Sequence, residues 1–468
     1  MKPLIQRQPA NYQPVTGMLP PQTIREFKGV NTFDPFSITD NFFTDMSNFV
    51  TDDYPAMTVR PGYTVLGNAI GSKVLGLGVW KDQEIHAVFN DGTWRKWTGS
   101  AWSSPLASGL DTSAAWSFAN FQGNQPDVRL FGANGVNGLR MYNGTSVTTF
   151  GDAPANINFI STYANRLWGA SGKELRACAL DQPDKWNVFN GNDEDSYGKD
   201  IESTRGENIN SLSSGMSKLI VGMPNSLHEL YGSNPSDFQT RLVTEETGVA
   251  NNQSLFVQDS VLNFIHTNGI YRFISGGVGP DRSFSDIVKK YFLNVNNSTA
   301  GTDGKKFYFQ TEPGKILVYD PRMTTWVVWT GINPTCFSIF QHQLYIGDSH
   351  GRVLRLGGLD DAGSPITWFA TTKPFTSGSV AQKTRWIKLW TFWELAAGSF
   401  LNVYLSTSSE GNDWELVQTV TGTGNKIERI IIPVQKYVLA NYVRIKFEGT
   451  EWARLHEHTR QVRQLPLY

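Results

Sequence analysis

Short apolar runs alternate with turn residues along most of the chain. In "HAVFNDGTWRKW" two such runs flank the turn Asn90–Gly92, and the same arrangement recurs with turns near positions 134, 171, 225, 268, 313 and 350. Two apolar runs on either side of an Asn- or Gly-containing turn predict a β-hairpin. A hairpin about every forty residues is typical of a β-propeller, whose blades each need four short strands.

The segments around each hairpin supply the other two strands of a blade. A short apolar run such as "KVLGLGVW" precedes each hairpin, and a segment with Trp or Phe such as "DKWNVF" follows most of them. The seventh hairpin lacks an obvious outer strand nearby. Either "SPITWFATTKPF" or a strand from the N-terminal side would complete it, so six and seven blades both remain open.

The pattern changes after about residue 376, where the alternation becomes strict. In "YVRIKFE", Val443, Ile445 and Phe447 fall on one face of a predicted strand. The other face carries Tyr442, Arg444, Lys446 and Glu448. One buried face per strand predicts a two-layer β-sandwich for residues 376–468, after a propeller at 61–375.

Residues 1–60 differ from both of these regions. The segment begins rich in Pro and Gln and continues with phenylalanines interrupted by Asp, Pro and Asn. Such a segment buries little apolar surface by itself, so it is predicted to be an extended arm that orders on a neighbouring subunit. The predicted fold is therefore all-β: an N-terminal arm, a six- or seven-bladed β-propeller and a C-terminal β-sandwich.

Composition narrows the classes of function. The 468 residues include 42 acidic and 41 basic ones, a balance that disfavours a dedicated DNA-binding fold. Cys178 and Cys336 are far apart, which excludes a disulfide framework and a cysteine zinc site. The first thirty residues do not read as a signal peptide, and no apolar stretch is long enough to predict a membrane segment.

Three short segments are candidates for chemistry, each with a structural alternative. "HEH" at His456–His458 would place two imidazoles on one strand face, too few for a metal site without a third ligand. An acidic loop would suit a calcium ion, a basic partner or simply solvent; it contains Asp193, Glu194, Asp195, Asp200 and Glu202. "STSSEGNDWELV" is similar to the Asp-box hairpin of sialidases, with Ser409 or Glu410 at the aspartate position.

No nucleotide-binding, hydrolase or metalloprotease motif is present, so we predict no enzyme activity, no catalytic residue, no cofactor and no metal. The tryptophans raise the question of sugar binding, because Trp94, Trp97 and Trp102 share one hairpin. Similar positions recur in other predicted blades, at Trp168, Trp186, Trp326 and Trp329. This recurrence favours packing between blades, and it leaves Arg95 and Lys96 as the residues expected to be exposed.

The segment "GVNTFDPFSITDNFFTDMSNFVTDDYPAMTVRPGYTVLG" resembles the opening of bacteriophage virion proteins in which "D-x-x-N-x…YPAL-x-x-RPG" leads into a β-propeller. The matching residues are Asn48, Tyr54, Pro55, Ala56, Arg60, Pro61 and Gly62. The strands after "WIKLWTFWEL" also look like the sandwich that ends such proteins. By their residue types, Pro55 and Pro61 stiffen the turn, Gly62 permits it, and Arg60 is a candidate for a bidentate contact.

This resemblance implies a structural protein of the virion tail, of the tail nozzle or packaged-DNA stabilisation kind. Such proteins form a homo-oligomeric ring beside adaptor and portal proteins, contact passing DNA without sequence specificity and help to retain the genome. The implied location is the virion tail, after assembly in the cytoplasm of a bacterial host. Two alternatives remain: a glycan- or receptor-binding propeller module of a phage tail, and a propeller glycosidase.

Overall fold

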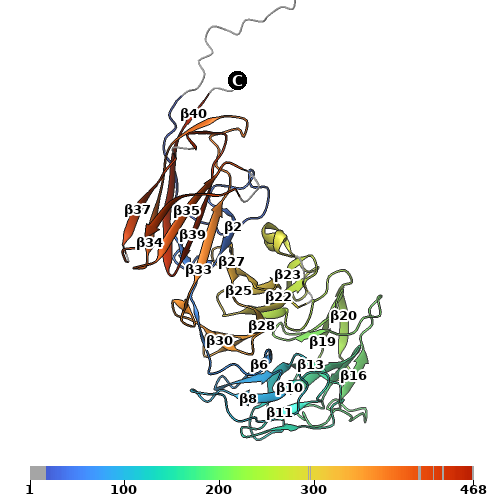
Figure 1. The fold of residues 1–468 in the computed structure, drawn as a ribbon. Coiled ribbons are helices and arrows are strands. Elements are labelled where there is room, and N and C mark those ends of the chain that lie inside the picture. The colour runs from blue at the N-terminus through green and yellow to red at the C-terminus, as the bar shows by residue number, and fades with distance from the viewer. Residues whose placement is uncertain are drawn as a thin grey trace, which may run out of the picture. The chain divides into compact units, whose positions relative to one another are not determined.

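The computed structural model describes residues 17–292, 295, 297–408, 413–424, 426–434 and 437–465. Its elements are β-strands in small, mostly antiparallel sheets (Figure 1), and the one helix within these residues is the 3₁₀ helix η1, Ser283–Tyr291. The predicted all-β class is confirmed. No helix in the part of the chain that the structure describes is both long and apolar enough to cross a membrane.

The chain divides into two compact units. One comprises Pro61–Arg322 and Val328–Ser364 and is called the repeat unit below. The other combines the residues up to Arg60, the short stretch Met323–Val327 and the residues from Pro365 on, and is called the terminal unit. Each unit is described by itself.

The repeat unit contains seven sheets that follow one another along the chain. The first three are formed by β6 (Val74–Trp80), β7 (Glu84–Phe89) and β8 (Thr93–Lys96); β9 (Ser117–Phe121), β10 (Arg129–Ala133), β11 (Arg140–Tyr142) and β12 (Val147–Thr149); and β13 (Asn158–Tyr163), β14 (Arg166–Ser171), β15 (Glu174–Ala177) and β16 (Tyr197–Asp200). The fourth and fifth are formed by β17 (Ser211–Ser213), β18 (Leu219–Gly222), β19 (Leu227–Tyr231) and β20 (Gln239–Thr244); and β21 (Leu255–Gln258), β22 (Val261–His266) and β23 (Gly269–Ile274).

The last two sheets complete the series. The sixth contains β24 (Thr299–Thr302), β25 (Phe307–Glu312), β26 (Lys315–Asp320) and β27 (Thr325–Thr330). The seventh contains β28 (Pro334–Phe340), β29 (Gln343–Asp348), β30 (Val353–Leu356), β5 (Tyr63–Val65), β31 (Asp360–Asp361) and β32 (Ser364–Pro365). All seven predicted turns join the second and third strands of a sheet, as at Gly92, whose positive φ of 80° suits glycine.

Burial explains why these strands do not alternate between apolar and polar residues. The second strand of every sheet is buried along nearly its whole length on both faces, as in β7 and β22. The first strands of neighbouring sheets lie against each other, among them β6 with β9, β9 with β13 and β24 with β28. The first strand of the last sheet, β28, also contacts β6 of the first sheet.

The seventh sheet receives its next strand from the start of the unit. β5 pairs antiparallel with β30, with Tyr63 opposite Leu356. Of the two sources left open by the sequence, the N-terminal side therefore supplies this strand. The other candidate, "SPITWFATTKPF", is divided between β32 and β33 (Thr367–Thr372), and β33 belongs to a sheet of the terminal unit.

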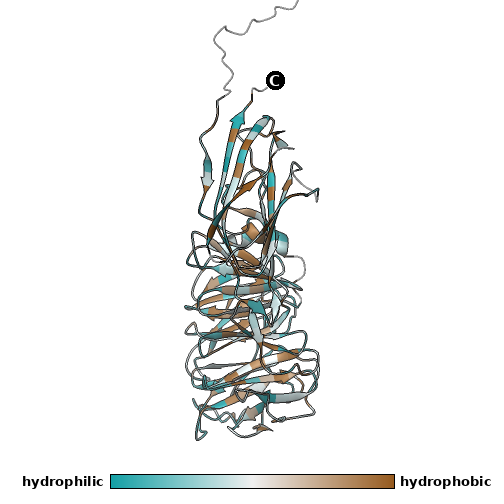
Figure 2. Ribbon diagram, turned by 60° about the vertical axis from the view of Figure 1, so that its left-hand side comes forward, coloured by the Kyte–Doolittle hydropathy of each residue, from teal (hydrophilic) through white to brown (hydrophobic). Residues whose placement is uncertain are grey.

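The terminal unit has two larger sheets. One runs β3 (Phe49–Val50), β4 (Met57–Val59), β40 (Ala453–Gln464), β34 (Thr384–Leu395) and β37 (Ile427–Ile432), with β1 (Gln22–Ile24) on β40 and β38 (Leu439–Ala440) on β34. The other runs β2 (Phe43–Ser47), β33, β39 (Arg444–Thr450), β35 (Phe400–Ser406) and β36 (Glu415–Thr421). Figure 2 shows apolar and polar bands alternating along strands of this unit.

The core of the terminal unit confirms the alternation predicted for β39. Val443, Ile445 and Phe447 are fully buried, and the residues between them are partly exposed. The indoles of Trp368 and Trp393 stack in the same core, with ring centroids 5.3 Å apart. This packing gives each sheet one buried and one open face.

The segment predicted as an arm contributes strands to this unit. Strands β1 and β4 pair with β40, and β2 pairs with β33, so the described residues before Pro61 extend the chain's own sheets. The reason is apolar content: Phe27, Phe43, Met46 and Phe49 are almost completely buried. Composition alone underestimated how much apolar surface this segment buries, because the sheets that cover its aromatic residues come from the other end of the chain. Residues 1–16 lie outside the described residues.

Candidate functional site

The matched residues Asn48 to Gly62 form one connected structure. Asn48 has a positive φ of 65°, a conformation that asparagine tolerates better than most residues. Its side chain donates a hydrogen bond from Nδ2 to the Thr367 carbonyl (2.7 Å) and accepts one at Oδ1 from Arg60 Nε (2.8 Å). Arg60, which is 2% exposed, also donates its backbone N–H to the Asn48 carbonyl. Arg60 was expected to make a bidentate contact, and its guanidinium binds this asparagine.

The rest of the motif shapes the same turn. The Tyr54–Pro55 peptide bond is cis, and Thr58 donates a hydrogen bond to Asp53 (2.7 Å). Gly62 has no room for a side chain, because an added Cβ would lie 1.8 Å from the Asp360 carbonyl oxygen. The matched residues therefore have structural roles, Asn48 to Arg60 within the terminal unit and Gly62 within the repeat unit.

We expect Asn48→Ala to destabilise the terminal unit by about 2–3 kcal/mol. Alanine would lose two hydrogen bonds to buried groups and would have to adopt a left-handed backbone conformation. Asn48→Gly separates these causes, since glycine accepts the backbone and loses only the hydrogen bonds. Urea denaturation followed by hydrogen exchange at β3 and β4 measures the effect. An Asn48→Ala protein as stable as wild type would contradict this account of the motif.

The tryptophans are mostly packing residues. The indoles of Trp94, Trp168, Trp186, Trp326 and Trp329 are at most 1% exposed, so they offer no surface on which a sugar ring could stack. Trp97 and Trp102 are half-buried and pack edge to face, with centroids 5.5 Å apart. The expectation that recurrent tryptophans pack within the fold is confirmed for the five buried ones.

Arg95 and Lys96 were expected to be exposed, and this was wrong. Arg95 donates hydrogen bonds to Thr93 Oγ1 (3.0 Å) and to the Ser103 carbonyl (3.1 Å), and its side chain is 22% exposed. Lys96 donates to Glu84 Oε1 (2.8 Å) and Tyr142 Oη (3.0 Å), and its side chain is 26% exposed. The partners of Lys96 come from β7 and from β11 of the next sheet, so Lys96 helps to join two sheets, whereas Arg95 bonds within its own hairpin and the loop that follows.

The acidic loop packs against the guanidinium of Arg166, which lies on β14. The buried Arg166 donates from Nη1 to the Cys178 carbonyl (2.9 Å) and from Nη2 to the Asp193 carbonyl (2.7 Å). Asp195 accepts hydrogen bonds from the backbone N–H of Gly191 (2.7 Å) and Asn192 (3.2 Å). Burial raises the pKa of Asp195, but these N–H donors and Arg166 outweigh it and leave the pKa below its usual range. The guanidinium thus binds backbone carbonyls, and among the proposed calcium ligands the carboxylates of Asp200 and Glu202 contact Lys173.

The two histidines of "HEH" do not share a face, which corrects the sequence prediction. The register between β34 and β40 shifts at this point: Phe392 faces Glu457, and Trp393 faces Leu455. Such a β-bulge breaks the two-residue alternation of a strand. His456 is half-buried near Glu394 (3.4 Å), and His458 is 2% exposed in the core.

The remaining candidates are the Asp-box segment and the two cysteines. Ser406 donates a hydrogen bond to Asp413 (3.1 Å), but Ser409 and Glu410, at the Asp-box position, lie outside the described residues. Cys178 and Cys336 are buried free thiols, and burial raises the pKa of each to about 12. Where the structure describes the chain, no group of three or more His, Cys, Asp or Glu residues could hold a metal ion.

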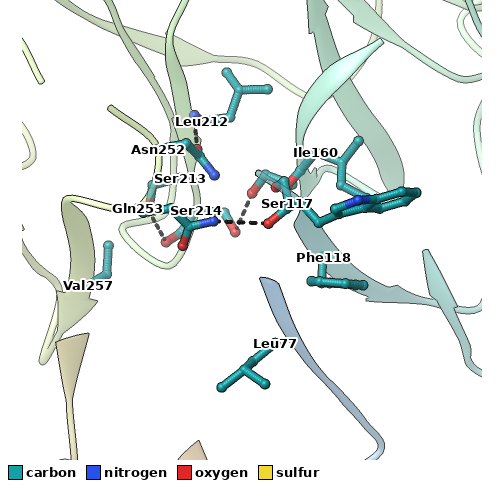
Figure 3. A pocket seen from close by; sticks show the side chains of 12 residues that line it. Leu77, Ser117, Phe118, Ile160, Leu212, Ser213, Ser214, Asn252, Gln253 and Val257 are labelled. Carbon is teal, nitrogen blue, oxygen red and sulfur yellow. Dashed lines mark hydrogen bonds between the residues drawn. The ribbon is translucent and has the colours of Figure 1, made fainter. Parts of the chain in front are cut away.

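A further candidate site is a polar cavity between the first strands of the repeat unit. One part of it, about 380 Å³, is lined by residues from five sheets, including Leu77, Ser117, Ser161, Ser213 and Gln253. Figure 3 shows Ser117, Ser214 and Gln253 pointing toward one another across this space. The Gln253 amide donates a hydrogen bond across the cavity to the Trp116 carbonyl (3.0 Å).

A second part of about 530 Å³ shares Asn252 and Gln253 with the first. Its lining adds Lys73, Ser298 and Glu312, and it contains no histidine or cysteine. Two buried polar atoms beside these spaces, Ser298 Oγ and Trp116 Nε1, have no hydrogen-bond partner. The lining can therefore hydrogen-bond a small polar molecule.

Sequence reasoning missed this cavity. Its amides and hydroxyls lie at the starts of the first strands, in segments such as "NNQSLF" and "AAWSF". Polar residues that repeatedly precede the first apolar run of each hairpin were the available signal. This signal does not distinguish a cavity lining from a turn, because each of these residues is also an ordinary turn residue.

No protein-family model matches the chain. No curated protein sequence matches it. Among solved structures, the extracellular domain of a one-component system from B. thetaiotaomicron has 13% identity and a TM-score of 0.47, covering 76% of this chain and 48% of that chain. The extracellular domain of a hybrid two-component system from the same organism has 13% identity and a TM-score of 0.47, covering 76% and 47%.

A further hybrid two-component system from B. thetaiotaomicron has an extracellular domain with 12% identity and a TM-score of 0.42, covering 70% of this chain and 45% of that chain. This chain therefore spans about half the length of each of these solved structures. At such TM-scores the likeness carries no conclusion about the arrangement of the sheets or about function.

Proposed function

We propose that the seven sheets of the repeat unit are the blades of a seven-bladed β-propeller and that the two sheets of the terminal unit form a β-sandwich. Contacts between the first strands of neighbouring sheets, including β28 with β6, support the ring. The pairing of β5 with β30 supports its closure by strands from both ends of the unit.

On this architecture, the chain acts as a structural protein of a bacteriophage tail. It is a ring component of the nozzle or hub type that contributes to the DNA channel and to retention of the genome. The observation that carries this proposal is the Asn48–Gly62 segment, which resembles phage virion proteins and whose matched residues include the linked pair Asn48 and Arg60. A nearly neutral net charge of −1 suits a channel wall along which DNA must slide.

Two measurements on the same protein test this function. Mass spectrometry of purified virions asks whether the chain is a tail component, and negative-stain imaging of the concentrated protein asks whether it forms rings. We expect the chain in virions and rings of defined symmetry. A protein that stays monomeric at high concentration and is absent from virions would exclude the structural role.

The polar cavity favours a second candidate, a glycan- or receptor-binding module of a phage tail. Its serine hydroxyls and the Gln253 amide can exchange hydrogen bonds with a sugar. A glycan array would support this function if binding depended on Gln253. Binding that was unchanged in Gln253→Ala would remove the cavity as the site, and absence of any binding would remove the candidate.

A further inference from the structure

One open sheet face of the terminal unit carries four basic side chains. Strands β37, β34 and β40 lie side by side (Figure 1), and residues directly opposite each other in an antiparallel pair point to the same face. The register places Arg385 opposite Arg463, Lys388 opposite Gln461, and Arg429 opposite Phe392. The buried residues of β34, such as Leu389 and Trp393, belong to the other face. The side chains Arg385, Lys388, Arg429 and Arg463 are called the basic face below.

The four cations are exposed. No hydrogen bond, ion pair or ring contact joins any of their side chains to a described residue. The carboxylates on the same face are engaged elsewhere. Glu394 lies 3.4 Å from Arg454, and Glu457 accepts a hydrogen bond from Arg25 (2.7 Å). The basic face is thus a concentration of uncompensated positive charge.

The arrangement is unfavourable for the isolated chain. Arg385 and Arg463 are direct cross-strand neighbours, and like charges in such positions repel each other and destabilise a sheet. A negatively charged partner would convert this repulsion into attraction. The repulsion between Arg385 and Arg463 therefore favours an anionic partner.

Apolar side chains at the edge of the same sheet narrow the choice of partner. Ile427, Ile431 and Leu439 are 59%, 57% and 59% exposed. Ile431 lies opposite Trp390 on the open face, and Leu439 lies opposite Arg385. Strand β37 ends the sheet, and among the described residues only β34 pairs with it. Unpaired backbone groups on such an edge can accept another strand.

We propose that the basic face binds an extended segment of another protein that contains both aliphatic residues and Glu or Asp. The segment would lie along β34 on the open face, cover Ile431, and direct its carboxylates at Arg429, Lys388 and the pair of opposed arginines. Three arginines, two aromatic residues and exposed isoleucines resemble the composition of protein interfaces. A nucleic-acid backbone would leave the aliphatic side chains without partners. The inference does not depend on the proposed phage function.

The test uses the full-length protein and a fluorescent peptide of five Glu-Val repeats, followed by fluorescence anisotropy. The triple variant R385Q/R429Q/R463Q should weaken peptide binding about tenfold, since three exposed ion pairs are lost. Its melting temperature should equal or exceed that of wild type, because the Arg385–Arg463 repulsion is gone. The matched control K290Q/K305Q/R355Q removes three exposed cations from the repeat unit and should bind like wild type.

The affinity of the peptide should also fall as salt screens the charges. A Lys-Val peptide should not bind. Absence of Glu-Val binding, or equal binding by wild type and the triple variant, would overturn the proposal. So would tighter binding of a duplex oligonucleotide through the same arginines, which would assign the face to nucleic acid. Self-association that the triple variant abolished would assign it to a second copy of the chain.

Discussion

Acidification from pH 6.5 to pH 4 is expected to destabilise the terminal unit by about 3 kcal/mol through one side chain, His458. His458 is 2% exposed, and neither ring nitrogen has a hydrogen-bond partner. Its ring stacks on Phe375 (centroids 5.4 Å apart) and meets the edge of Phe447. Burial, together with the charge of nearby Arg460, lowers the pKa of His458 to about 3, against the weaker influence of Asp40.

The direction of the effect follows from proton binding. In the unfolded chain this histidine titrates near 6.5, and in the folded protein it stays neutral down to about pH 3. Between these values the unfolded state binds more protons than the folded state, so each unit of acidification favours unfolding by about 1.4 kcal/mol. The charged groups that face the ring, Arg460 and its ion-pair partner Asp40, do not reverse this sign.

The measurement compares wild type with His458→Leu in urea denaturation at pH 7, 5.5 and 4. Leucine removes no hydrogen bond, so the variant should match or exceed wild type at pH 7 and should lose less stability at pH 4. His456→Leu is the control for loss of a histidine from the same strand. If His458→Leu and wild type lost stability in parallel, the buried neutral imidazole would not be the cause of the acid sensitivity.

The sequence predicted those parts of the fold that depend on local chemistry. All seven hairpin turns were found because Gly, Asn and Pro act over two or three residues. The strict alternation around Phe447 likewise identified a buried face. By contrast, the pairing of β5 with β30 joins residues almost three hundred positions apart, and no local pattern chooses between that partner and "SPITWFATTKPF".

The candidate sites were less predictable, because they depend on strand register and on neighbouring sheets. A single bulge next to His456 separates two histidines that simple alternation places on one face. Lys96 is less exposed than predicted because it donates a hydrogen bond to Tyr142, which belongs to the next sheet. The basic face is equally hidden in the sequence: Arg385 and Arg463 become neighbours only through the pairing of β34 with β40.

The second large effect concerns Glu229, a fully buried carboxylate on β19. It accepts hydrogen bonds from Lys218 (3.0 Å) and Arg241 (2.7 Å) in its own sheet. Ser275 Oγ (2.6 Å) and the N–H of Gly276 (3.2 Å) reach it from the end of β23 in the next sheet. Burial raises the pKa of Glu229, but the hydrogen bonds from Ser275 and Lys218 outweigh it and leave the pKa below its usual value.

Glu229→Ala is therefore expected to destabilise the repeat unit by about 3–5 kcal/mol, because it leaves two cations and a hydroxyl without their shared acceptor. Glu229→Gln should cost less, since the amide keeps an acceptor oxygen. Glu174→Ala, which removes a carboxylate from a surface pair with Arg176, is the matched control and should cost less than 1 kcal/mol. Hydrogen exchange at the amides of β18, β19 and β23 reports the loss in the sheets concerned.

The pH dependence distinguishes the charge of Glu229 from its volume. A carboxyl group with a lowered pKa stabilises the folded state above its unfolded value of 4.5, and this contribution disappears as the pH falls through the folded pKa. The difference in stability between wild type and Glu229→Gln should therefore be largest near pH 7 and should shrink below pH 4.5. A difference that stayed constant with pH would mean that shape, and not the ion pairs between neighbouring sheets, makes this position important.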